Sequence, residues 1–229
     1  MKQSNFYGSE QEYTAFIADV AGDYAFRDKL GYRLLKRLVD ICASLAGLLL
    51  LLPLFPFIVA LIKLETPGPI FFRQRRVGLR GRLFDFFKFR SMAVDAESRK
   101  NELEHLNEAK GAAFKIKDDP RVTGVGRFLR RSSLDEFPQL FNVLRGDMAF
   151  IGPRPQIPIE VREYAPQDAL RLLVKPGLTC LWQVSGRSHL DFSEWMDLDR
   201  TYVRSRSVRT DILILLRTLP AVIERKGAY

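Results

Sequence analysis

The chain places two adjacent carboxylates, Asp135 and Glu136, in its most arginine-rich segment. Arginines stand around the pair at positions 127, 130, 131, 145 and 154, and the whole chain has a formal net charge of +9. Arginine binds phosphate oxygens through paired hydrogen bonds, and an ionised carboxylate can act as a nucleophile. An aspartate that attacks a phosphoryl group forms an acyl phosphate, which can pass the phosphoryl group onward. The pair is therefore either a nucleophile beside a phosphate site or a helix cap with surface charge.

Pro138 constrains the helix that follows the pair, because a helix tolerates proline only in its first turn. We therefore expect Asp135 as the N-cap, Glu136 at the first helical position, and an end of the helix before Gly146. Free N–H groups at the start of a helix hold anions and favour an ionised carboxylate. This placement accommodates a structural cap and a nucleophile alike.

Turn-rich segments after this helix carry isolated polar residues. Arg154 stands between two prolines in IGPRP, which predicts a stiff extended segment. KPGLTCLWQVSGR contains one predicted turn at Pro176–Gly177 and a second at Arg187. Asp191 precedes Glu194 by three residues, which predicts the start of another helix. Taken singly, an arginine in such a setting is more often a surface residue than a ligand.

An uncharged apolar run at residues 41–62 must position these residues relative to their surroundings. As a straight helix of about 1.5 Å per residue, it would just cross a hydrocarbon core of about 30 Å. Pro53 and Pro56 interrupt it, and basic residues flank it on both sides, which the positive-inside rule assigns to the cytoplasm. A helix–break–helix hairpin that enters and leaves by the cytoplasmic face satisfies both flanks. These features alone leave a kinked spanning helix open, with a buried helix of a soluble core as the third alternative.

The segments after the apolar run predict a catalytic or binding unit. Residues 70–90 contain two β-prone aromatic stretches separated by Gly78–Gly81, which predicts a hairpin. Basic residues interleaved with aromatics also occur in nucleic-acid binders, but a position next to the apolar run favours lipid headgroups or a nucleotide substrate. Residues 91–111 predict a polar helix without a site. The apolar segment 210–229 suits an interfacial helix or a core contact.

The composition narrows the class of protein. With 229 residues, 47% of them hydrophobic and 28% charged, the chain is globular rather than disordered. Its pI of about 9.7 indicates an acidic partner. Cys42 and Cys180 are too far apart in the sequence for a disulfide framework or a zinc motif, which favours a reducing setting. Residues 1–30 lack the pattern of a secretory signal and predict a polar, partly helical extension.

Several motifs follow one another along the chain. They are KRLVDI (36–41), the broken apolar run, ETPGPIFFRQRRVG (65–78), KFRSM (88–92), DPRVTGVGRFLRRSSLDEFPQLFNVLRGDM (119–148), IGPRP (151–155), KPGLT (175–179) and WQVSGR (182–187). This ordered series resembles the bacterial sugar transferase family, the monotopic phosphoglycosyl transferases. The resemblance covers residues 33–229, and the closing KGAY with the polar spacer looks most like the exopolysaccharide-priming branch. That branch often carries a large N-terminal membrane region.

The resemblance implies a specific reaction. Such enzymes transfer a sugar-1-phosphate from a UDP-sugar to undecaprenyl phosphate, which gives an undecaprenyl-diphospho-sugar and UMP. In the family the residue that matches Asp135 attacks the β-phosphorus in a ping-pong mechanism. Magnesium is the implied cofactor, anchored by Asp135 and Glu136. Glu136 binds the metal, orients Asp135 or handles a proton, and the sequence does not choose among these roles.

The resemblance also implies a substrate site. The matching polar positions, expected to bind substrate, are Lys88, Arg130, Arg154, Arg187 and Asp199. The arginines are the natural phosphate ligands among them. The usual break of the family's membrane hairpin is a Ser-Pro pair, and Leu52–Pro53 stands at that place here. The resemblance favours the re-entrant hairpin over the spanning helix.

We therefore expect a mostly helical α+β protein with a re-entrant membrane helix–break–helix, interfacial helices and a small β-hairpin. Its parts are a polar N-terminal extension at residues 1–32, the membrane hairpin at 33–64 and a catalytic domain at 65–229. The catalytic domain is expected on the cytoplasmic face of the inner membrane. The expected partners are a UDP-sugar, undecaprenyl phosphate and the membrane, without nucleic acid, and the sequence leaves a homo-oligomer open.

The main alternative is a non-catalytic, membrane-anchored binder of anionic lipid or nucleic acid. It explains the basic charge and the apolar run, but it does not explain the carboxylate pair or the framed Arg154 and Arg187. A soluble nucleotide-binding enzyme would leave residues 41–62 without a purpose. The sugar and the glycan pathway are not specified by the sequence.

Overall fold

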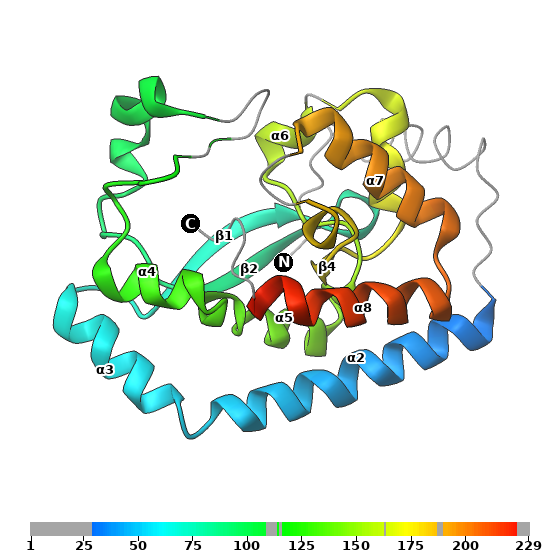
Figure 1. Cartoon of the computed structure of the whole chain (residues 1–229), viewed down its shortest axis with the longest axis horizontal. Helices are drawn as coiled ribbons and strands as arrows, with labels where there is room; N and C mark the ends of the chain where they lie inside the picture. Colours follow the sequence, from blue (N-terminus) through cyan, green and yellow to red (C-terminus); the bar gives the residue numbers. More distant parts are fainter. Residues whose placement is uncertain (1–28, 109–113, 115, 163, 187–189, 224–229) are drawn as a thin grey trace.

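In the described part of the chain, helices make up most of the regular structure and two two-stranded sheets complete it (Figure 1). The computed structural model describes residues 29–108, 114, 116–162, 164–186 and 190–223. Most of the expected N-terminal extension, Arg187 and the closing KGAY lie outside the described residues. The predicted α+β, mostly helical class is confirmed.

The elements follow one another in this order along the chain. The α-helices are α2 (Leu30–Leu51), α3 (Phe55–Glu65), α4 (Gly124–Arg131), α5 (Gln139–Arg145), α6 (Pro158–Arg162), α7 (Phe192–Ser205) and α8 (Val208–Ile223). The strands are β1 (Phe71–Val77), β2 (Leu83–Phe89), β3 (Ala149–Ile151) and β4 (Gly177–Thr179). The 3-10 segments are η1 (Leu79–Gly81), η2 (Ser98–Leu106), η3 (Leu134–Glu136), η4 (Pro166–Leu173) and η5 (Trp182–Val184).

The predicted hairpin is present, as the antiparallel pair β1–β2 that runs from Phe71 opposite Phe89 to Val77 opposite Leu83. Side chains alternate between the two faces of a strand. Phe84 and Phe86 therefore share one face, and both are buried against α5 and Met148. Lys88 is the next residue on that face, so the strand that forms the core also directs a cation inward.

The second sheet is a parallel pair of β3 and β4, with Ala149 opposite Gly177 and Ile151 opposite Thr179. The predicted turn at Pro176–Gly177 is wrong, because Gly177 begins a strand there. Glycine is required for a close approach of two backbones. A Cβ atom at Gly177 would lie 2.1 Å from the backbone nitrogen of Gly152. The pairing of distant segments, and not a local reversal, accounts for this glycine.

The apolar run is broken into two helices, as predicted. α2 ends at Leu51, α3 begins at Phe55, and the two axes are bent by 62°. Pro53 lies in the break, and Pro56 lies in the first turn of α3, where a missing N–H is tolerated. Within the described residues no single helix is long and apolar enough to cross a bilayer, while the bent pair passes on length and composition.

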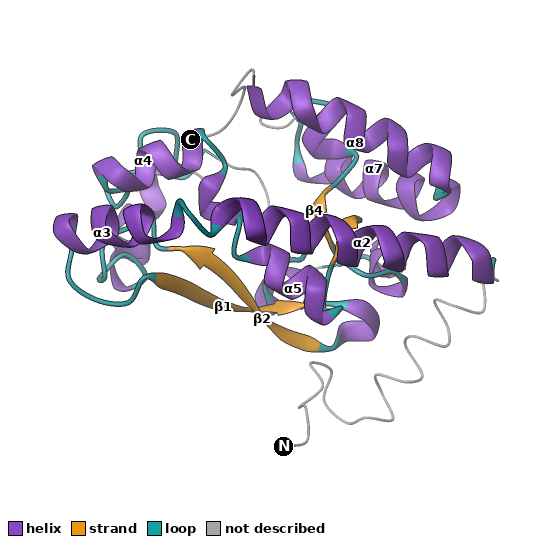
Figure 2. Ribbon diagram, turned by 90° about the horizontal axis from the view of Figure 1, so that it is seen from below, coloured by secondary structure: helices purple, strands orange, loops and turns teal. Residues whose placement is uncertain are grey.

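The outer face of this helix pair is apolar and uncovered (Figure 2). The exposed side chains are Leu30, Leu34, Leu35, Leu38, Val39, Leu45, Leu49, Leu50, Leu52, Leu54, Phe57, Leu61 and Leu64. α8 contacts the core through Ile214, as expected of a core contact, and exposes leucines and isoleucine on its other sides. Uncovered apolar faces of this size mark sites of membrane or protein contact.

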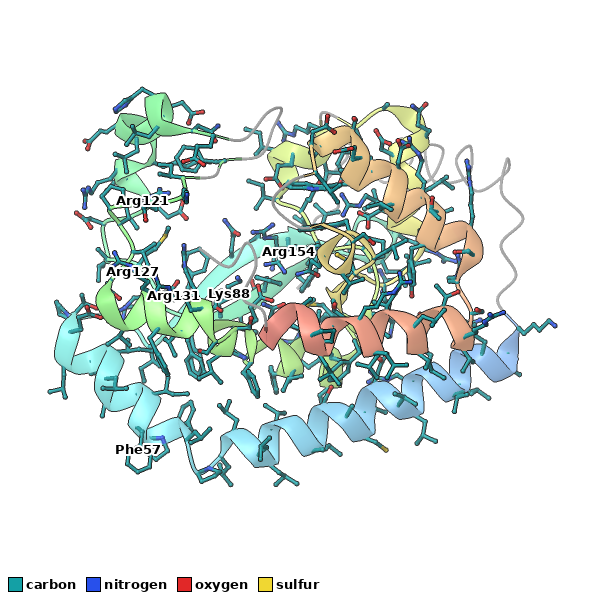
Figure 3. The ribbon with its side chains drawn as sticks, in the orientation of Figure 1. Phe57, Lys88, Arg121, Arg127, Arg131 and Arg154 are labelled. Atoms are coloured by element: carbon teal, nitrogen blue, oxygen red, sulfur yellow. The ribbon has the colours of Figure 1, made fainter. Side chains whose placement is uncertain are left out.

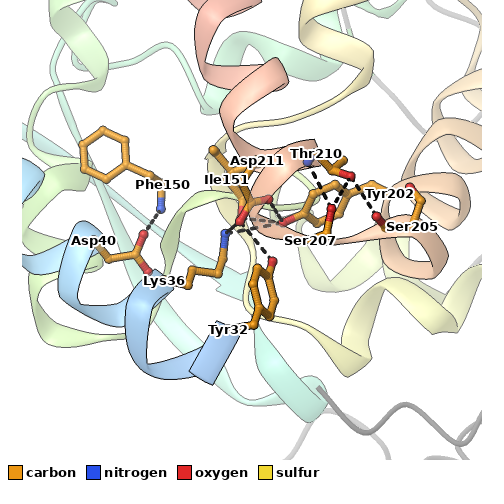
Figure 4. Close-up of polar contacts among 10 residues, drawn as sticks. All are labelled: Tyr32, Lys36, Asp40, Phe150, Ile151, Tyr202, Ser205, Ser207, Thr210 and Asp211. Carbon is orange, nitrogen blue, oxygen red and sulfur yellow. Dashed lines mark hydrogen bonds and ion pairs between the residues drawn. The ribbon is translucent and has the colours of Figure 1, made fainter. Parts of the chain in front are cut away.

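A buried polar network fastens the first half of α2 to the rest of the molecule (Figure 4). Asp211 at the start of α8 accepts hydrogen bonds from Tyr32 at 3.0 Å, Lys36 at 2.7 Å and Tyr202 at 2.9 Å. Asp40 accepts a bond of 2.9 Å from the backbone of Phe150. Because buried carboxylates are costly without partners, these bonds fix α2 against α7, α8 and β3.

The predicted polar helix at residues 91–111 is wrong. The segment contains a 3-10 stretch, η2, with no buried side chain, and residues 109–111 lie outside the described part. A helix that is polar all round has no apolar face to pack, and packing supplies most of the stability of a short helix. The segment therefore does not form a regular α-helix.

Candidate active site

The carboxylate pair lies in a 3-10 turn that precedes α5. Ser133 adopts a left-handed conformation, with φ of 56°, and residues 134–136 form η3. α5 then begins separately after Pro138. The prediction that Asp135 is an N-cap is wrong, because the left-handed residue turns the chain before α5 and no side-chain cap is formed. The predicted end of the helix is confirmed at Gly146, whose φ is 89°.

Lys88 of β2 faces both carboxylates. Its Nζ lies 3.3 Å from Oδ2 of Asp135 and 2.8 Å from Oε1 of Glu136. Asp135 is only 5% exposed, whereas Glu136 is half-buried. The hairpin therefore delivers one cation to two neighbouring anions, and the excess negative charge needs a second partner.

Arg154 supplies that second cation. Its Nη2 lies 2.6 Å from Oε1 of Glu136, and its Nη1 lies 3.5 Å from Oε2 (Figure 3). The two nitrogens of one planar guanidinium thus face the two oxygens of one carboxylate, the geometry that arginine also uses for phosphate. The structure brings together Lys88, Asp135, Glu136 and Arg154, as expected.

Backbone contacts fix the segment that carries Arg154. Arg76 of β1 donates to the carbonyl of Pro155 at 2.9 Å, and the backbone nitrogen of Gly177 donates to the carbonyl of Pro153 at 2.9 Å. Arg171 of η4 donates to the carbonyl of Arg154 itself at 2.6 Å. Prolines have fixed φ and no N–H, so the carbonyls are the groups through which this extended segment is held.

Arg130 of α4 approaches the pair from another side. Its Nε donates to Oγ of Ser91 at 2.9 Å, and its charge favours the ionised form of Asp135. Burial lowers the pKa of Arg130, although the charge of Asp135 opposes this effect. Gly126 allows the contact between α4 and the residues after β2, since a Cβ atom there would lie 1.9 Å from the carbonyl oxygen of Ser91.

Asp199 lies away from the pair and is connected to it indirectly. It is 1% exposed, and its Oδ2 lies 2.7 Å from Nη2 of Arg171. Burial raises the pKa of Asp199 to about 6, while the charge of Arg171 opposes the rise. Asp199 therefore contacts the residue that holds Arg154, and substrate binding by Asp199 stays a prediction. The same is true of Arg187, which lies outside the described residues. α7 begins at Asp191 with a capping box to Glu194, as predicted.

The two carboxylates differ in their electrostatics. Burial raises the pKa of Glu136, but the charges of Arg154 and Lys88 outweigh it, so the net pKa is below the ordinary value. Burial also raises the pKa of Asp135, and here Lys88 offsets the effect only in part, so the net pKa stays above the ordinary value. Glu136 is a permanent anion held by two cations. Asp135 is a buried carboxylate whose Oδ1 has no hydrogen-bond partner among the described residues.

Two contributors to the site were not expected from the sequence, Arg76 and Arg171. Arg76 stands opposite the buried Phe84 in the hairpin register, so alternation along β1 would have placed it on the inner face. The pKa of Arg76 is lowered to about 10 by burial and by the charge of Arg154. Arg171 lies among apolar residues in ALRLLV, a pattern that indicates a buried charge in need of a partner.

The carboxylate pair fits part of a magnesium site. No group of three or more His, Cys, Asp or Glu side chains that could hold a metal ion occurs within the described ranges. Magnesium in phosphate-transfer sites is held by one or two carboxylates together with phosphates of the substrate. The free Oδ1 of Asp135 suits such a role, whereas both oxygens of Glu136 contact cations.

Comparison with known proteins gives one family. The family described as "Bacterial sugar transferase" matches residues 31–225. The chain is similar to the galactosyl transferase CpsE of Streptococcus agalactiae, with 44% identity over 87% of this chain and 44% of the relative. It is similar to the undecaprenyl-phosphate galactose phosphotransferase of Salmonella typhimurium, with 42% identity over 88% of this chain and 43% of the relative.

A third relative is matched along most of its length. The exopolysaccharide production protein ExoY of Rhizobium meliloti is 40% identical, over 85% of this chain and 88% of the relative. The chain thus spans less than half of the CpsE and Salmonella proteins.

Proposed function

The chain belongs to the bacterial sugar transferase family, and we propose that it transfers a sugar-1-phosphate from a UDP-sugar to undecaprenyl phosphate. The products are UMP and an undecaprenyl-diphospho-sugar, the first lipid-linked intermediate of an exopolysaccharide or another surface glycan. The names of the relatives support an undecaprenyl phosphate acceptor and an exopolysaccharide pathway. The observation that carries the proposal is the buried Asp135 beside a carboxylate that two cations already neutralise.

In the first step Asp135 attacks the β-phosphorus of the UDP-sugar. A bond forms between a carboxylate oxygen of Asp135 and this phosphorus. The bond from the phosphorus to the bridging oxygen breaks, and UMP leaves with the electron pair. The enzyme then carries an acyl phosphate bearing the sugar, and no proton transfer is required, because both the attacking and the leaving groups are anions.

In the second step an oxygen of undecaprenyl phosphate attacks the same phosphorus. The bond between Asp135 and phosphorus breaks, and Asp135 regains its carboxylate. The lipid now carries the new diphosphate linkage to the sugar. The buried position of Asp135 keeps water from the acyl phosphate between the two steps.

The cations divide the remaining work. Lys88 and Arg154 stabilise negative charge that develops on the transferred phosphoryl group, because preorganised cations act strongly in a site that excludes water. Glu136 holds both of them in place through bonds of 2.8 and 2.6 Å. Arg130 lies on the other side of Asp135 and is suited to the phosphate of the acceptor. Glu136 is thus an orienting residue rather than a second nucleophile.

Magnesium is part of the proposal. Asp135, with Glu136 beside it, would hold the ion together with the diphosphate of the UDP-sugar. When bound, the ion neutralises phosphate charge and thereby favours departure of UMP. The residues of the chain contribute binding, orientation and exclusion of water around this group.

The proposed membrane placement rests on α2 and α3. Their uncovered apolar face and the 62° bend support a re-entrant hairpin that enters and leaves by the same side. Basic residues on both flanks support the cytoplasmic side of the inner membrane, where UDP-sugars are available. In Figure 1, α2 and α3 lie along one edge of the molecule and the candidate site lies above them.

The experiment that tests this function is a panel of UDP-sugars with undecaprenyl phosphate and Mg²⁺, scored by release of UMP. One sugar should give release that depends on the acceptor beyond the first turnover and stops when EDTA removes the metal. The Asp135→Asn variant is the matched blank. No release with any sugar would favour a membrane-anchored binder of anionic ligands.

A further inference from the structure

The outward side of α4 carries a second basic site. A pocket of about 260 Å³ is lined by Gly124, Arg127, Phe128, Arg131 and Ser132. Arg127 and Arg131 are one helical turn apart, so their side chains lie on the same face of α4. Both are exposed, whereas Gly126 and Leu129 on the opposite side of the helix are buried. The pocket therefore faces away from the side of α4 that packs on the protein.

The two arginines of this pocket lack partners within the described part of the chain. Neither has a side-chain hydrogen bond or an ion pair there. The arginines nearby are different: Arg121 is paired with Asp119 at 2.6 Å, and Arg130 is bonded to Ser91. Two adjacent guanidinium groups without a counter-ion repel each other, and a ligand with negative charge would relieve this repulsion.

Contacts between α3 and α4 determine where the pocket lies relative to the apolar hairpin. Glu65, the last residue of α3, accepts bonds from the backbone nitrogens of Gly124 at 2.6 Å and Val125 at 2.9 Å. Ile58 and Ile62 of α3 pack in one cluster with Leu129 of α4. The start of α4 is thus tied to the point at which the apolar hairpin ends.

The surroundings of the pocket combine charge with apolar surface. Phe128 in its wall is 56% exposed, and Phe57, Leu61 and Leu64 of the neighbouring α3 are exposed as well. Figure 3 labels Phe57 on α3 and both arginines on α4, at the same end of the molecule. The carboxylate of Glu65 lies at one end of the pocket, but both of its oxygens are bonded to the backbone of α4.

We propose that this pocket, the α4 pocket, binds the phosphate headgroup of an acidic membrane phospholipid. The guanidinium groups provide forked donors for phosphate oxygens, and Phe128 with the exposed side chains of α3 contacts the acyl chains. An acidic lipid is favoured over a zwitterionic one, because two cations meet no unengaged carboxylate in the pocket. The inference rests on the membrane placement proposed above, and it does not depend on the reaction.

The α4 pocket would set the height of the candidate active site above the bilayer. α4 carries Arg130 toward Asp135 on one side and the α4 pocket on the other. A headgroup bound on the outward side fixes α4 at the interface, and it thereby fixes Arg130 where the phosphate of a lipid acceptor must arrive.

The test measures which lipids the purified full chain retains. Protein in a neutral detergent is equilibrated with equal amounts of phosphatidylglycerol and phosphatidylcholine, and the bound lipids are then counted by mass spectrometry. The comparison includes wild type, Arg127→Gln/Arg131→Gln and Arg73→Gln/Arg75→Gln. The last variant is the matched control, because it removes the same charge from two exposed arginines that already pair with Asp85.

We expect wild type and the control to retain phosphatidylglycerol with a preference of about fivefold or more, since one basic residue near an anionic surface favours binding by about that factor. The Arg127/Arg131 variant should lose this preference. An unchanged preference in that variant, or an equal loss in the control, would overturn the proposal. Displacement of phosphatidylglycerol by stoichiometric undecaprenyl phosphate would also overturn it, because the pocket would then belong to the acceptor. Release of UMP, assayed separately in lipid-free detergent, reports on the proposed reaction alone.

Discussion

Arg171 donates a hydrogen bond of 2.6 Å to the backbone carbonyl of Arg154, the residue whose own guanidinium holds Glu136. Arg171 is in turn paired with the buried Asp199 at 2.7 Å. A chain of contacts therefore connects a carboxylate on α7 to the carboxylate pair in η3. Arg171 is a positioning residue, because it acts on the site only through the backbone of Arg154.

Replacing Arg171 with lysine should lower kcat by about a hundredfold, since a displacement of about 1 Å near the reacting groups has an effect of that order. Arg121→Lys is the matched control, because Arg121 is also buried and also bonds a carboxylate and a backbone carbonyl. Added guanidinium ion should restore part of the activity of Arg171→Ala and none in Arg121→Ala. A similar loss in both lysine variants, without rescue, would reduce Arg171 to a residue of general stability.

Replacing Arg154 with lysine should reduce kcat/KM by about one to two orders of magnitude. Lysine keeps the charge but cannot reach both oxygens of Glu136 with one planar group. Arg145→Lys serves as the comparison, because Arg145 is an exposed arginine 3.4 Å from Asp147. Steady-state assays of UMP release measure both. Equal tolerance at the two positions would show that the fork of Arg154 is not required.

The buried Asp199 predicts a dependence of stability on pH. Its pKa is raised to about 6 in the folded protein from 3.8, so the folded state holds the proton more tightly than the unfolded state does. Stability from this group is present below about pH 4 and is lost as the pH rises through 6. Asp199→Asn does not titrate and should gain stability relative to wild type over this interval, by about 3 kcal/mol at most.

Thermal unfolding of the two proteins in detergent from pH 4 to 7 measures this difference. A relative loss of stability in the variant as the pH rises would mean that the ion pair with Arg171 outweighs the burial of the carboxylate.

The break between α2 and α3 predicts the topology of the hairpin. Replacing Pro53 and Pro56 with alanine restores two backbone donors and removes the steric cause of the bend. Some molecules should then cross as one helix and expose the N-terminus outside, although the basic residues at 33, 36 and 37 oppose this. The measurement is labelling of Ser4→Cys by a membrane-impermeant thiol reagent in intact cells, in a background without Cys42 and Cys180. Strong labelling without the proline substitutions would indicate a spanning helix in the natural sequence.

Much of the fold follows from local sequence patterns. The hairpin at residues 70–90, the broken apolar run, the capping box at Asp191 and the end of α5 at Gly146 were all predicted, because each depends on a few neighbouring residues. The parallel pairing of β3 and β4 was not predicted, since strands of three residues carry no periodic signal. The pairing depends on the approach of Gly177 to Gly152, which lie far apart in sequence.

The candidate site was predicted in its main residues and missed in its supports. Lys88, Glu136 and Arg154 stand in motifs, and the structure brings them together. Arg76 and Arg171 lie in apolar surroundings, where a sequence shows a buried charge but not its partner. The capping role of Asp135 failed because Ser133 adopts a left-handed conformation, which a serine seldom does and which no neighbouring residue predicts.

The most direct test of the account is the detection of a covalent intermediate on Asp135. The full chain is incubated with Mg²⁺ and the UDP-sugar that gives the fastest UMP release, without an acceptor, and its peptides are then mapped by mass spectrometry. We predict a sugar-phosphate adduct on Asp135 that disappears when undecaprenyl phosphate is added, and no adduct in Asp135→Asn. An adduct on a different residue, or full turnover by Asp135→Asn, would contradict the account.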